Sequence, residues 1–338
     1  MRRRGLYTAI LAALTVFAAC GKADLPSEDK PERKSQADPR LNHSSEYLAV
    51  FGDLQEYTAM EENMDYYDRS VQWLCTQIDE KIPFRSVLMV GDATWDNYEA
   101  FWVRFHKHSD ALAERIPYYS CTGNHDYDSD ESWRIPDRSS TRINPYAHWP
   151  GTDAGIVAYY EGTSLENYVA KLHLDDPDLY LLVLEYGTRK EVVAWASDYV
   201  TSHSGHRFLL MTHEWLTTEG ERISSTCSAR ARFEGLSTWS SPEEIWEALV
   251  KPNDNVVCVL CGHNGGYTAR LLSENAAGRK VPQMMFNLQY LPNAGNGLLQ
   301  LWEFPAGSDY VRVGAYDTVN KDWYQLDTSA VSFRYRNY

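Results

Sequence analysis

The chain has 338 residues, and its 32 Lys and Arg residues against 47 Asp and Glu residues give a formal net charge of -15. This acidic balance argues against a nucleic acid as the main partner, because binding to a phosphate backbone depends on clustered basic side chains. It leaves a small phosphorylated substrate open, since bound divalent metals reverse the local charge of an acidic site. An aromatic content of 13% is enough for a large core. No second linker or repeat divides the chain, so we expect one large domain over residues 46–338.

A basic and apolar N-terminus precedes this domain. Arg2, Arg3 and Arg4 are followed by an apolar run from Leu6 to Ala19 and then by Cys20. This pattern resembles a bacterial lipoprotein signal peptide over residues 1–19. Cleavage before Cys20 and its acylation would leave a lipid anchor in the membrane, on the extracytoplasmic side of the cell envelope. An ordinary signal peptide is the alternative. Residues 20–45 are polar and charged, which predicts a disordered tether.

The first part of the domain alternates strands with helices. Apolar periodicity predicts, in order, strand 47–51, helix 65–82, strand 86–90, helix 98–116 and strand 117–121. Three strands joined by two helices imply parallel neighbours with right-handed crossovers. Residues 127–153 then form a long insertion that includes Trp133 and Arg134. A loop of this length predicts a functional rim or lid over a site; a surface loop without function is the alternative.

Strands and helices alternate again in the second part. We predict strands 167–174, 179–184, 206–211 and 256–261, a helix near 191–202 and a rim loop over 217–240. We predict a further helix with Ser241 as its N-cap and Pro242 at its first helical position, because Glu244 closes a capping box with Ser241. Four last strands, 267–272, 282–288, 297–304 and 310–316, are expected to form a second, largely antiparallel sheet. The predicted fold class is α/β, with two packed mixed β-sheets flanked by helices.

The cysteines lack the regular spacing of a disulfide scaffold. We expect most of them to be small core residues. Cys258 and Cys261 have the spacing of a redox pair. They lie three positions apart on a predicted strand, however, so their side chains should point to opposite faces.

Five short polar clusters each follow a predicted strand. They are Asp53-x-Gln55, Gly91-Asp92, Gly123-Asn124-His125-Asp126, Thr212-His213-Glu214 and Gly262-His263-Asn264-Gly265. Each alone is an ordinary turn or cap, but side chains at the ends of neighbouring strands converge. Their carboxylate, imidazole and amide groups suit two divalent or trivalent ions of Mn, Fe or Zn. Two such ions about 3.5 to 4 Å apart supply the charge compensation and the nucleophile for phosphoester hydrolysis.

In this order the clusters resemble those of the calcineurin-like metallophosphoesterase superfamily, whose fold is a four-layer sandwich. The resemblance covers residues 47–316. It implies that Asp53 and Gln55 bind the first metal and that Asp92 bridges both metals. It implies the ligands of the second metal as well, which are Asp92, Asn124, His213 and His263.

Two positions depart from the superfamily pattern. Gln55 stands where the first motif has a histidine, and Gly265 stands where the last motif has its second histidine. The first metal is left with a poor set of protein ligands, so we expect it to bind weakly or with help from water and substrate oxygens. The same departures, Asp-x-Gln and Gly-His-x-x-Gly, resemble a secreted bacterial subgroup of the superfamily.

The resemblance also implies a mechanism, in which a hydroxide on the metals attacks phosphorus. Asp92 would hold the metals, and His125 would protonate or stabilise the leaving oxygen. Asp126 or Asp96 could orient the His125 ring. The expected function is therefore metal-dependent hydrolysis of phosphomonoesters or phosphodiesters at the cell envelope.

The substrate contacts are less specific. Arg138, Arg142 and Arg189 could bind the phosphoryl group, because a guanidinium matches phosphate in a bidentate manner. Surface salt bridges are the alternative for each arginine. Tyr146 of the insertion is a further candidate contact. The competing function is that of a metal-binding lipoprotein with a degenerate first site, which binds or senses a ligand without turnover.

Overall fold

The structure is a computed structural model that describes residues 36–129, 136–176, 178–224, 238–265, 268–324 and 331–336. The predicted signal peptide and Cys20 lie outside the described residues, as do Trp133 and Arg134. Within the described ranges, no helix combines the length and the apolar character needed to cross a bilayer.

The folded unit begins earlier than the sequence indicated, at Gln36. Asp38 is buried, and its Oδ2 accepts hydrogen bonds from Trp73 Nε1 at 3.3 Å and from the Tyr316 hydroxyl at 2.5 Å. Leu41 joins the core. Asp38 and Leu41 therefore anchor the end of the predicted tether to the domain.

The first sheet has the strand order β15-β14-β13-β1-β2-β3, and β16 also pairs with β14. β1, β2 and β3 run parallel, as predicted, and β13 pairs antiparallel with β1. The strands are β1 (Ser45–Phe51), β2 (Phe84–Met89), β3 (Tyr118–Ser120), β13 (Leu298–Pro305), β14 (Tyr310–Asp317), β15 (Asp322–Tyr324) and β16 (Val331–Arg334).

The second sheet has the order β11-β12-β10-β9-β8-β7-β6. Its central strands β8, β9, β10 and β12 are parallel, and the outer strands pair antiparallel. The strands are β6 (Ile156–Tyr159), β7 (Tyr168–Lys171), β8 (Leu179–Val183), β9 (Arg207–Met211), β10 (Val256–Cys261), β11 (Thr268–Glu274) and β12 (Lys280–Phe286).

The prediction that the last four strands form a sheet of their own was wrong. β11 and β12 extend the second sheet, whereas β13 and β14 extend the first. β13 pairs with β1, at the opposite end of the domain sequence. Alternating apolar residues determine which face of a strand is buried, but they do not determine which strand lies beside it.

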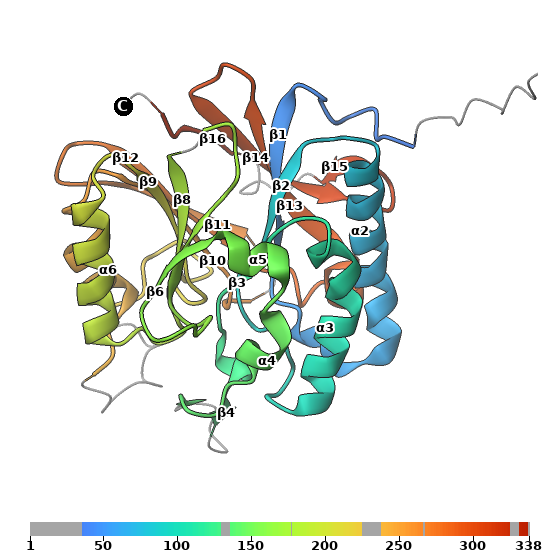
Figure 1. The fold of residues 1–338 in the computed structure, drawn as a ribbon, viewed down its shortest axis with the longest axis horizontal. Helices are drawn as coiled ribbons and strands as arrows, with labels where there is room; N and C mark the ends of the chain where they lie inside the picture. Colours follow the sequence, from blue (N-terminus) through green and yellow to red (C-terminus); the bar gives the residue numbers. More distant parts are fainter. Residues whose placement is uncertain are drawn as a thin grey trace, which may run out of the picture. The chain divides into compact units, whose positions relative to one another are not determined.

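Helices cover the outer faces of both sheets, as predicted for a four-layer arrangement. α2 and α3 lie along the first sheet, and α6 lies along the second (Figure 1). The capping box at Ser241 is confirmed, because the Glu244 backbone N donates to Ser241 Oγ at 3.1 Å. The helices are α1 (Gln55–Ala59), α2 (Glu61–Asp79), α3 (Glu99–Ala113), η1 (Asn124–Asp126), α4 (Ile143–Ala147), α5 (Pro150–Gly155), α6 (Lys190–Ser202), α7 (Pro242–Ile245), η3 (Trp246–Val250) and η4 (Pro292–Gly295).

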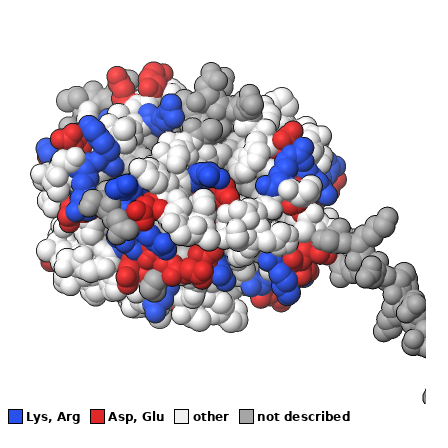
Figure 2. Space-filling model, turned by 90° about the horizontal axis from the view of Figure 1, so that it is seen from above, with Lys and Arg blue, Asp and Glu red and all other residues white. Residues whose placement is uncertain are grey.

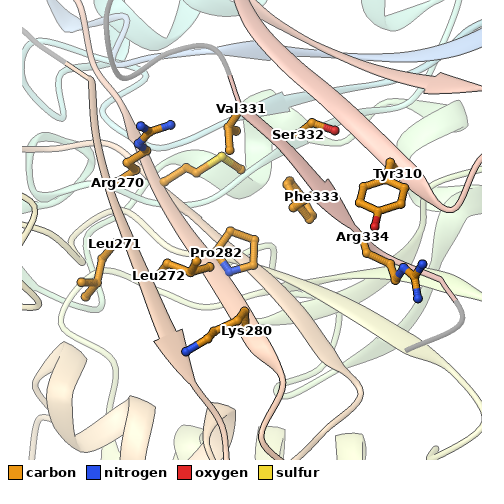
Figure 3. A pocket seen from close by; sticks show the side chains of 11 residues that line it. Arg270, Leu271, Leu272, Lys280, Pro282, Tyr310, Val331, Ser332, Phe333 and Arg334 are labelled. Atoms are coloured by element: carbon orange, nitrogen blue, oxygen red, sulfur yellow. The ribbon is translucent and has the colours of Figure 1, made fainter.

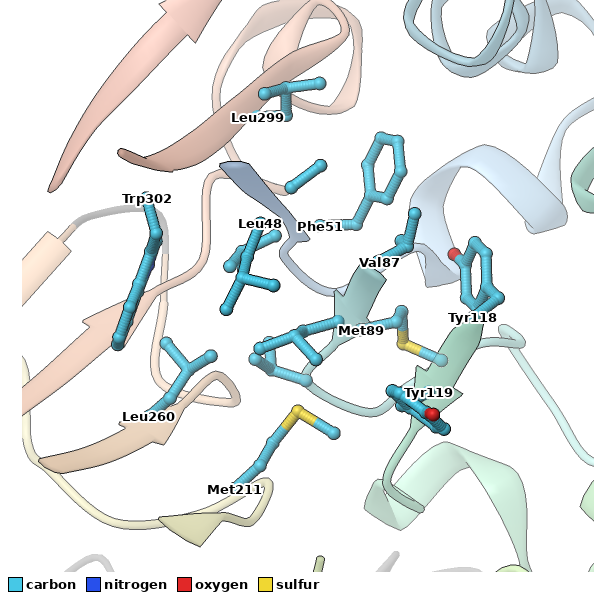
Figure 4. Packing of buried hydrophobic residues seen from close by; sticks show 14 of the residues in the cluster. Leu48, Phe51, Val87, Met89, Tyr118, Tyr119, Met211, Leu260, Leu299 and Trp302 are labelled. Carbon is cyan, nitrogen blue, oxygen red and sulfur yellow. The ribbon is translucent and has the colours of Figure 1, made fainter. Parts of the chain in front are cut away.

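The core follows from the period-two alternation of the strands. On β9, Leu209 and Met211 pack between the two sheets, whereas Phe208 and Leu210 pack on the α6 side. Met211 and Leu260 of the second sheet meet Met89 of the first in the layer shown in Figure 4. Burial of these side chains holds the two sheets face to face, at about 25 cal/mol per Å² of apolar area removed from water.

The insertion is more structured than the predicted loop. It begins with the short ribbon of β4 (Asp128–Ser129) and β5 (Pro136–Asp137) and continues with α4 and α5. Thr152 of α5 exchanges hydrogen bonds with the backbone of Tyr118 at 3.0 and 3.1 Å. This half of the insertion therefore covers the open edge of β3, which would otherwise expose unpaired backbone groups.

The predicted role of the cysteine pair is confirmed. Cys258 and Cys261 are buried and free of a disulfide, and they belong to different hydrophobic clusters on opposite faces of β10. Burial raises the pKa of both thiols. They are core residues of the second sheet.

Candidate metal centre

The five predicted clusters come together at the carboxyl ends of parallel strands from both sheets. Asp53, Asp92 and Asn124 follow β1, β2 and β3, and His213 and His263 follow β9 and β10. Apart from His263, which is partly exposed, these residues are buried. Side chains from the ends of two packed sheets can coordinate one metal ion from several directions, whereas the side chains of a single turn cannot.

Asp92, His213 and His263 form the centre of the cluster. One ligand atom from each lies within 4.8 Å of the others. His213 Nε2 is 3.1 Å from Asp92 Oδ2, 3.1 Å from His263 Nδ1 and 3.3 Å from Asn124 Oδ1. Imidazole nitrogens, a carboxylate and an amide oxygen at this spacing fit a divalent transition metal. The ligand set implied for the second metal is therefore assembled in the structure.

Outer hydrogen bonds orient both imidazoles toward this centre. His213 Nδ1 donates to the Val90 carbonyl at 2.7 Å, which leaves Nε2 to face the cluster. His263 Nε2 lies 3.5 Å from Glu214 Oε1, which leaves its Nδ1 for the cluster. Partners of this kind fix the tautomer of ligating histidines. Glu214 stands beside His213 in the fourth motif, but the sequence assigned it no role.

Electrostatics favour positive charge at the centre. Burial by itself would lower the pKa of His213, but the charges of Asp92 and Asp53 outweigh burial and raise that pKa to about 10. Burial opposes ionisation of Asp92, yet nearby His213 and His125 hold the pKa of this carboxyl below its ordinary value. Carboxylates concentrated in a dry site create the field that attracts a cation.

The turn after β2 has a conformation that few sequences tolerate. Gly91 and Asp92 both have positive φ angles, of 99° and 52°. A Cβ atom on Gly123 would overlap the Asp92 carboxylate, so this position accepts only glycine. Non-glycine residues rarely adopt such angles, and the surrounding structure must hold them in place.

Asp126 provides that support. Its carboxylate accepts hydrogen bonds from the backbone N–H groups of Gly123 at 2.8 Å and Thr94 at 3.1 Å, and from the Thr94 hydroxyl at 3.1 Å. Asp126 is fully buried, and burial together with the charge of Asp92 raises its pKa to about 6. Asp126 therefore ties the turn after β2 to the turn after β3, away from direct contact with solvent.

His125 stands beside the centre with a different partner from the expected one. Its backbone N donates to Asp92 Oδ1 at 3.0 Å, and its Nδ1 donates to the Trp95 carbonyl at 2.5 Å. The orienting role that we expected of Asp126 or Asp96 falls to this carbonyl. The Trp95 ring lies 5.7 Å from the His125 ring and is 36% exposed.

The region around Asp53 contains amides that the sequence did not reveal. Asn287 Nδ2 donates to Asp53 Oδ2 at 2.7 Å, and Gln289 Nε2 donates to the same oxygen at 3.2 Å. Gln55 Nε2 in turn donates to Gln289 Oε1. Asn287 and Gln289 directly follow β12, as the other motifs follow their strands, so the same pattern of a polar cluster after an apolar run could have identified them.

The residues around Asp53 fit a cation of a different kind. Gln55 Oε1 is buried without a hydrogen-bond partner. Buried polar atoms are nearly always paired, so this orphaned oxygen, together with the carboxylates of Asp53 and Asp92, fits a metal that prefers oxygen ligands. Gly265 contributes no ligand, as its lack of a side chain indicates.

The predicted substrate contacts are tied into the scaffold. Arg189 Nε pairs with the fully buried Glu185 at 2.8 Å, and Arg138 Nη1 lies 3.2 Å from the same carboxylate. Arg142 Nη1 donates to the Asn97 carbonyl at 2.5 Å. Tyr146 donates to Glu99 Oε1 at 3.1 Å. Arg138 is linked to the centre through Tyr186, because it also donates to the carbonyl of Tyr186, whose ring packs on His213 and His263.

A groove of about 830 Å³ lies elsewhere in the domain. Side chains of β11, β12, β14 and β16 line it, among them Pro282 and Phe333 (Figure 3), and no residue of the metal centre does so. On the face seen in Figure 2, basic and acidic side chains are interspersed. Neither the groove nor this surface contributes a residue to the metal centre at the strand ends.

Comparison with known proteins agrees with the arrangement of these motifs. A model of the calcineurin-like phosphoesterase family matches residues 47–267. The uncharacterized protein YvnB of Bacillus subtilis (strain 168) is 27% identical over 276 residues, which make up 78% of this chain but only 19% of YvnB. This chain therefore spans a small part of that relative.

Two solved structures are also similar. The NAD nucleotidase NadN of Haemophilus influenzae has a TM-score of 0.41 and 12% identity, over 83% of this chain and 53% of that one. A conserved uncharacterized protein (predicted phosphoesterase) of Streptococcus pneumoniae TIGR4 has a TM-score of 0.35 and 12% identity, over 86% of this chain and 98% of that one.

Proposed function

The chain belongs to the calcineurin-like phosphoesterase family, and on this premise we propose that it hydrolyses phosphomonoesters or phosphodiesters with the help of two metal ions. The observation that carries the proposal is the cluster of Asp92, His213 and His263, whose ligand atoms lie within 4.8 Å of one another. When bound, the metals would neutralise the phosphoryl oxygens and activate the attacking water. Mn, Fe and Zn are the candidate ions.

Different residues would bind each metal ion and transfer the proton. Asp92, Asn124, His213 and His263 would hold one ion, and Asp53, Gln55 and Asp92 would hold the other. His125 would pass a proton to the leaving oxygen from Nε2, because its Nδ1 is already committed to the Trp95 carbonyl. Asp126 keeps the turns that carry Asp92 and His125 in register.

We place this activity at the cell envelope, on a small phosphorylated compound outside the cytoplasm. The run of Arg2 to Arg4, the apolar stretch and Cys20 support a lipoprotein signal. Radioactive palmitate should label the wild-type chain in cells and should not label Cys20→Ala. Equal labelling of both chains would refute the anchor without bearing on the activity.

A binding protein without turnover is the second candidate. Gln55 and Gly265 favour it, because they remove both histidines from the first metal position. Such a protein would bind a metal and a phosphorylated ligand and would release no product.

Turnover separates the two candidates. The purified full chain would be loaded with Mn, Fe or Zn and assayed with 4-nitrophenyl phosphate and bis(4-nitrophenyl) phosphate. We expect hydrolysis that a chelator abolishes and that His213→Asn lacks, whereas His43→Asn, at an exposed position, retains it. Absence of turnover with every metal would refute the enzyme and leave the binding protein.

A further inference from the structure

Amide side chains take up the space around Asp53. Asn287 Nδ2 donates to Asp53 Oδ2 at 2.7 Å and to the His263 carbonyl at 3.0 Å. Asn287 Oδ1 accepts from the backbone N of Gln289 at 3.1 Å. Both ends of the Asn287 side chain are thus committed to holding Asp53, the loop after His263 and the loop after β12 in place.

The hydrogen bonds of this group set the orientation of Gln55. Gln289 turns its Nε2 toward Asp53 and donates to Oδ2 at 3.2 Å. Gln289 Oε1 then accepts from Gln55 Nε2. The remaining atom is Gln55 Oε1, which is buried and has no hydrogen-bond partner, in a residue that is 3% exposed. Hydrogen bonds thus run from Gln55 through Gln289 to Asp53, and they leave one buried acceptor atom, Gln55 Oε1, without a partner.

The same segment covers Gly265. A Cβ atom at position 265 would lie 3.3 Å from Cε2 of the Tyr290 ring. The Tyr290 ring of the loop after β12 therefore lies next to Gly265. Gln55 contacts Gln289 of the same loop, so both departures border the loop after β12.

We propose that the first metal position of this chain is built from oxygen ligands alone and takes a hard cation, Mg²⁺ or Mn²⁺, in preference to Zn²⁺. Gln55 Oε1 is a ligand beside the carboxylates of Asp53 and Asp92, and Gln289 and Asn287 are positioning residues. Oxygen-only sites suit Mg²⁺ and Mn²⁺, whereas Zn²⁺ is usually held by nitrogen or sulfur. The inference rests on the proposed function in that it concerns the same site.

Metal binding without substrate tests this proposal. Isothermal titration of the purified full chain should show two equivalents of Mn²⁺ but only one tight equivalent of Zn²⁺, at the position of His213 and His263. Electron paramagnetic resonance of Mn²⁺ should report two neighbouring ions. Two tight equivalents of Zn²⁺, or a single equivalent of Mn²⁺, would overturn the proposal without any need for a variant.

Substitutions at Gln55 and Gln289 test which residue binds the first metal and which one positions it. Gln55→Met and Gln289→Met keep the size of the side chain but remove its amide, and each should weaken one equivalent of Mn²⁺ by about tenfold or more. The Zn²⁺ equivalent should not change. Gln72→Met, at an exposed position of α2, is the matched control. Unchanged binding of both Mn²⁺ equivalents by Gln55→Met would refute its role as a ligand.

These results are independent of turnover. A chain that binds metals as described but hydrolyses nothing would refute the proposed function and support this inference. A chain that hydrolyses phosphoesters with two tight Zn²⁺ ions would refute this inference alone.

Discussion

His213 Nε2 lies 3.1 Å from Asp92 Oδ2, although β9 and β2, which precede these residues, belong to different sheets. The contact therefore depends on the packing of the two sheets as well as on the local turns. Met89 and Met211, the last residues of these strands, are both buried in the layer between the sheets. The core thus sets the distance between the two ligands.

Trp95 should contribute to substrate binding. Its exposed ring stands beside His125, where the leaving group would lie, and can stack on an aromatic leaving group. Trp95→Ala should raise KM for 4-nitrophenyl phosphate by about fivefold, equivalent to about 1 kcal/mol. Trp95→Phe should restore most of the loss. Steady-state kinetics with methyl phosphate provide the control, since a similar rise in its KM would show that stacking is not the cause.

Arg189 should prove to be a structural residue. Its guanidinium pairs with Glu185, whose side chain is fully buried, and with Glu161 at 3.3 Å. Arg189→Ala would leave Glu185 with Arg138 as its neighbouring cation and should lower the free energy of unfolding by about 2 kcal/mol. Urea denaturation measures this change, and Arg115→Ala, at an exposed ion pair, should have little effect. A stable Arg189→Ala chain with a strongly raised KM would instead support the predicted phosphate contact.

Glu166 should make stability depend on pH. Burial, together with the neighbouring Glu185, raises the pKa of Glu166 above its ordinary value of 4.5. The folded chain then holds this proton more tightly than the unfolded chain does. Protonated Glu166 therefore adds fully to the free energy of unfolding when the pH is below the ordinary pKa of a glutamate. This contribution is lost as the pH rises through the raised pKa of Glu166 in the folded chain.

Glu166→Gln removes this contribution and keeps a group that can accept from the Tyr127 hydroxyl. The melting temperature of the variant relative to wild type should therefore increase as the pH is raised from about pH 4 to pH 8. The melting temperature of Glu62→Gln, at an exposed position of α2, should differ from that of wild type by the same amount at every pH. A constant difference between Glu166→Gln and wild type would contradict the prediction.

Local patterns in the sequence predicted most of the parallel core and the five motifs. Apolar runs that end at Asp53, Asp92 and His213 are strong local signals, and parallel strands bring their ends together. The partners of the last strands were not predictable in this way, because β13 pairs with a strand from the other end of the domain. Such pairing depends on the register of whole sheets.

The sequence was misleading for two kinds of residue. Asn287 lies within the predicted strand 282–288, whereas β12 ends at Phe286, so the misplaced strand end concealed the polar cluster of Asn287 and Gln289. The arginines looked free to bind phosphate because the sequence does not show that Glu185 is buried beside Arg138 and Arg189. Burial of a charged partner is a property of the packed fold.

Turnover by Asp92→Asn shows whether the strand-end cluster is the catalytic metal centre. Asp92 is the one carboxylate assigned to both metals, and asparagine keeps its size while it removes the charge. With 4-nitrophenyl phosphate and saturating Mn²⁺, kcat/KM of Asp92→Asn should fall by about a hundredfold or more. Asp198→Asn, at an exposed position of α6, should match wild type. Wild-type turnover by Asp92→Asn would contradict the assignment of the strand-end cluster as the catalytic metal centre.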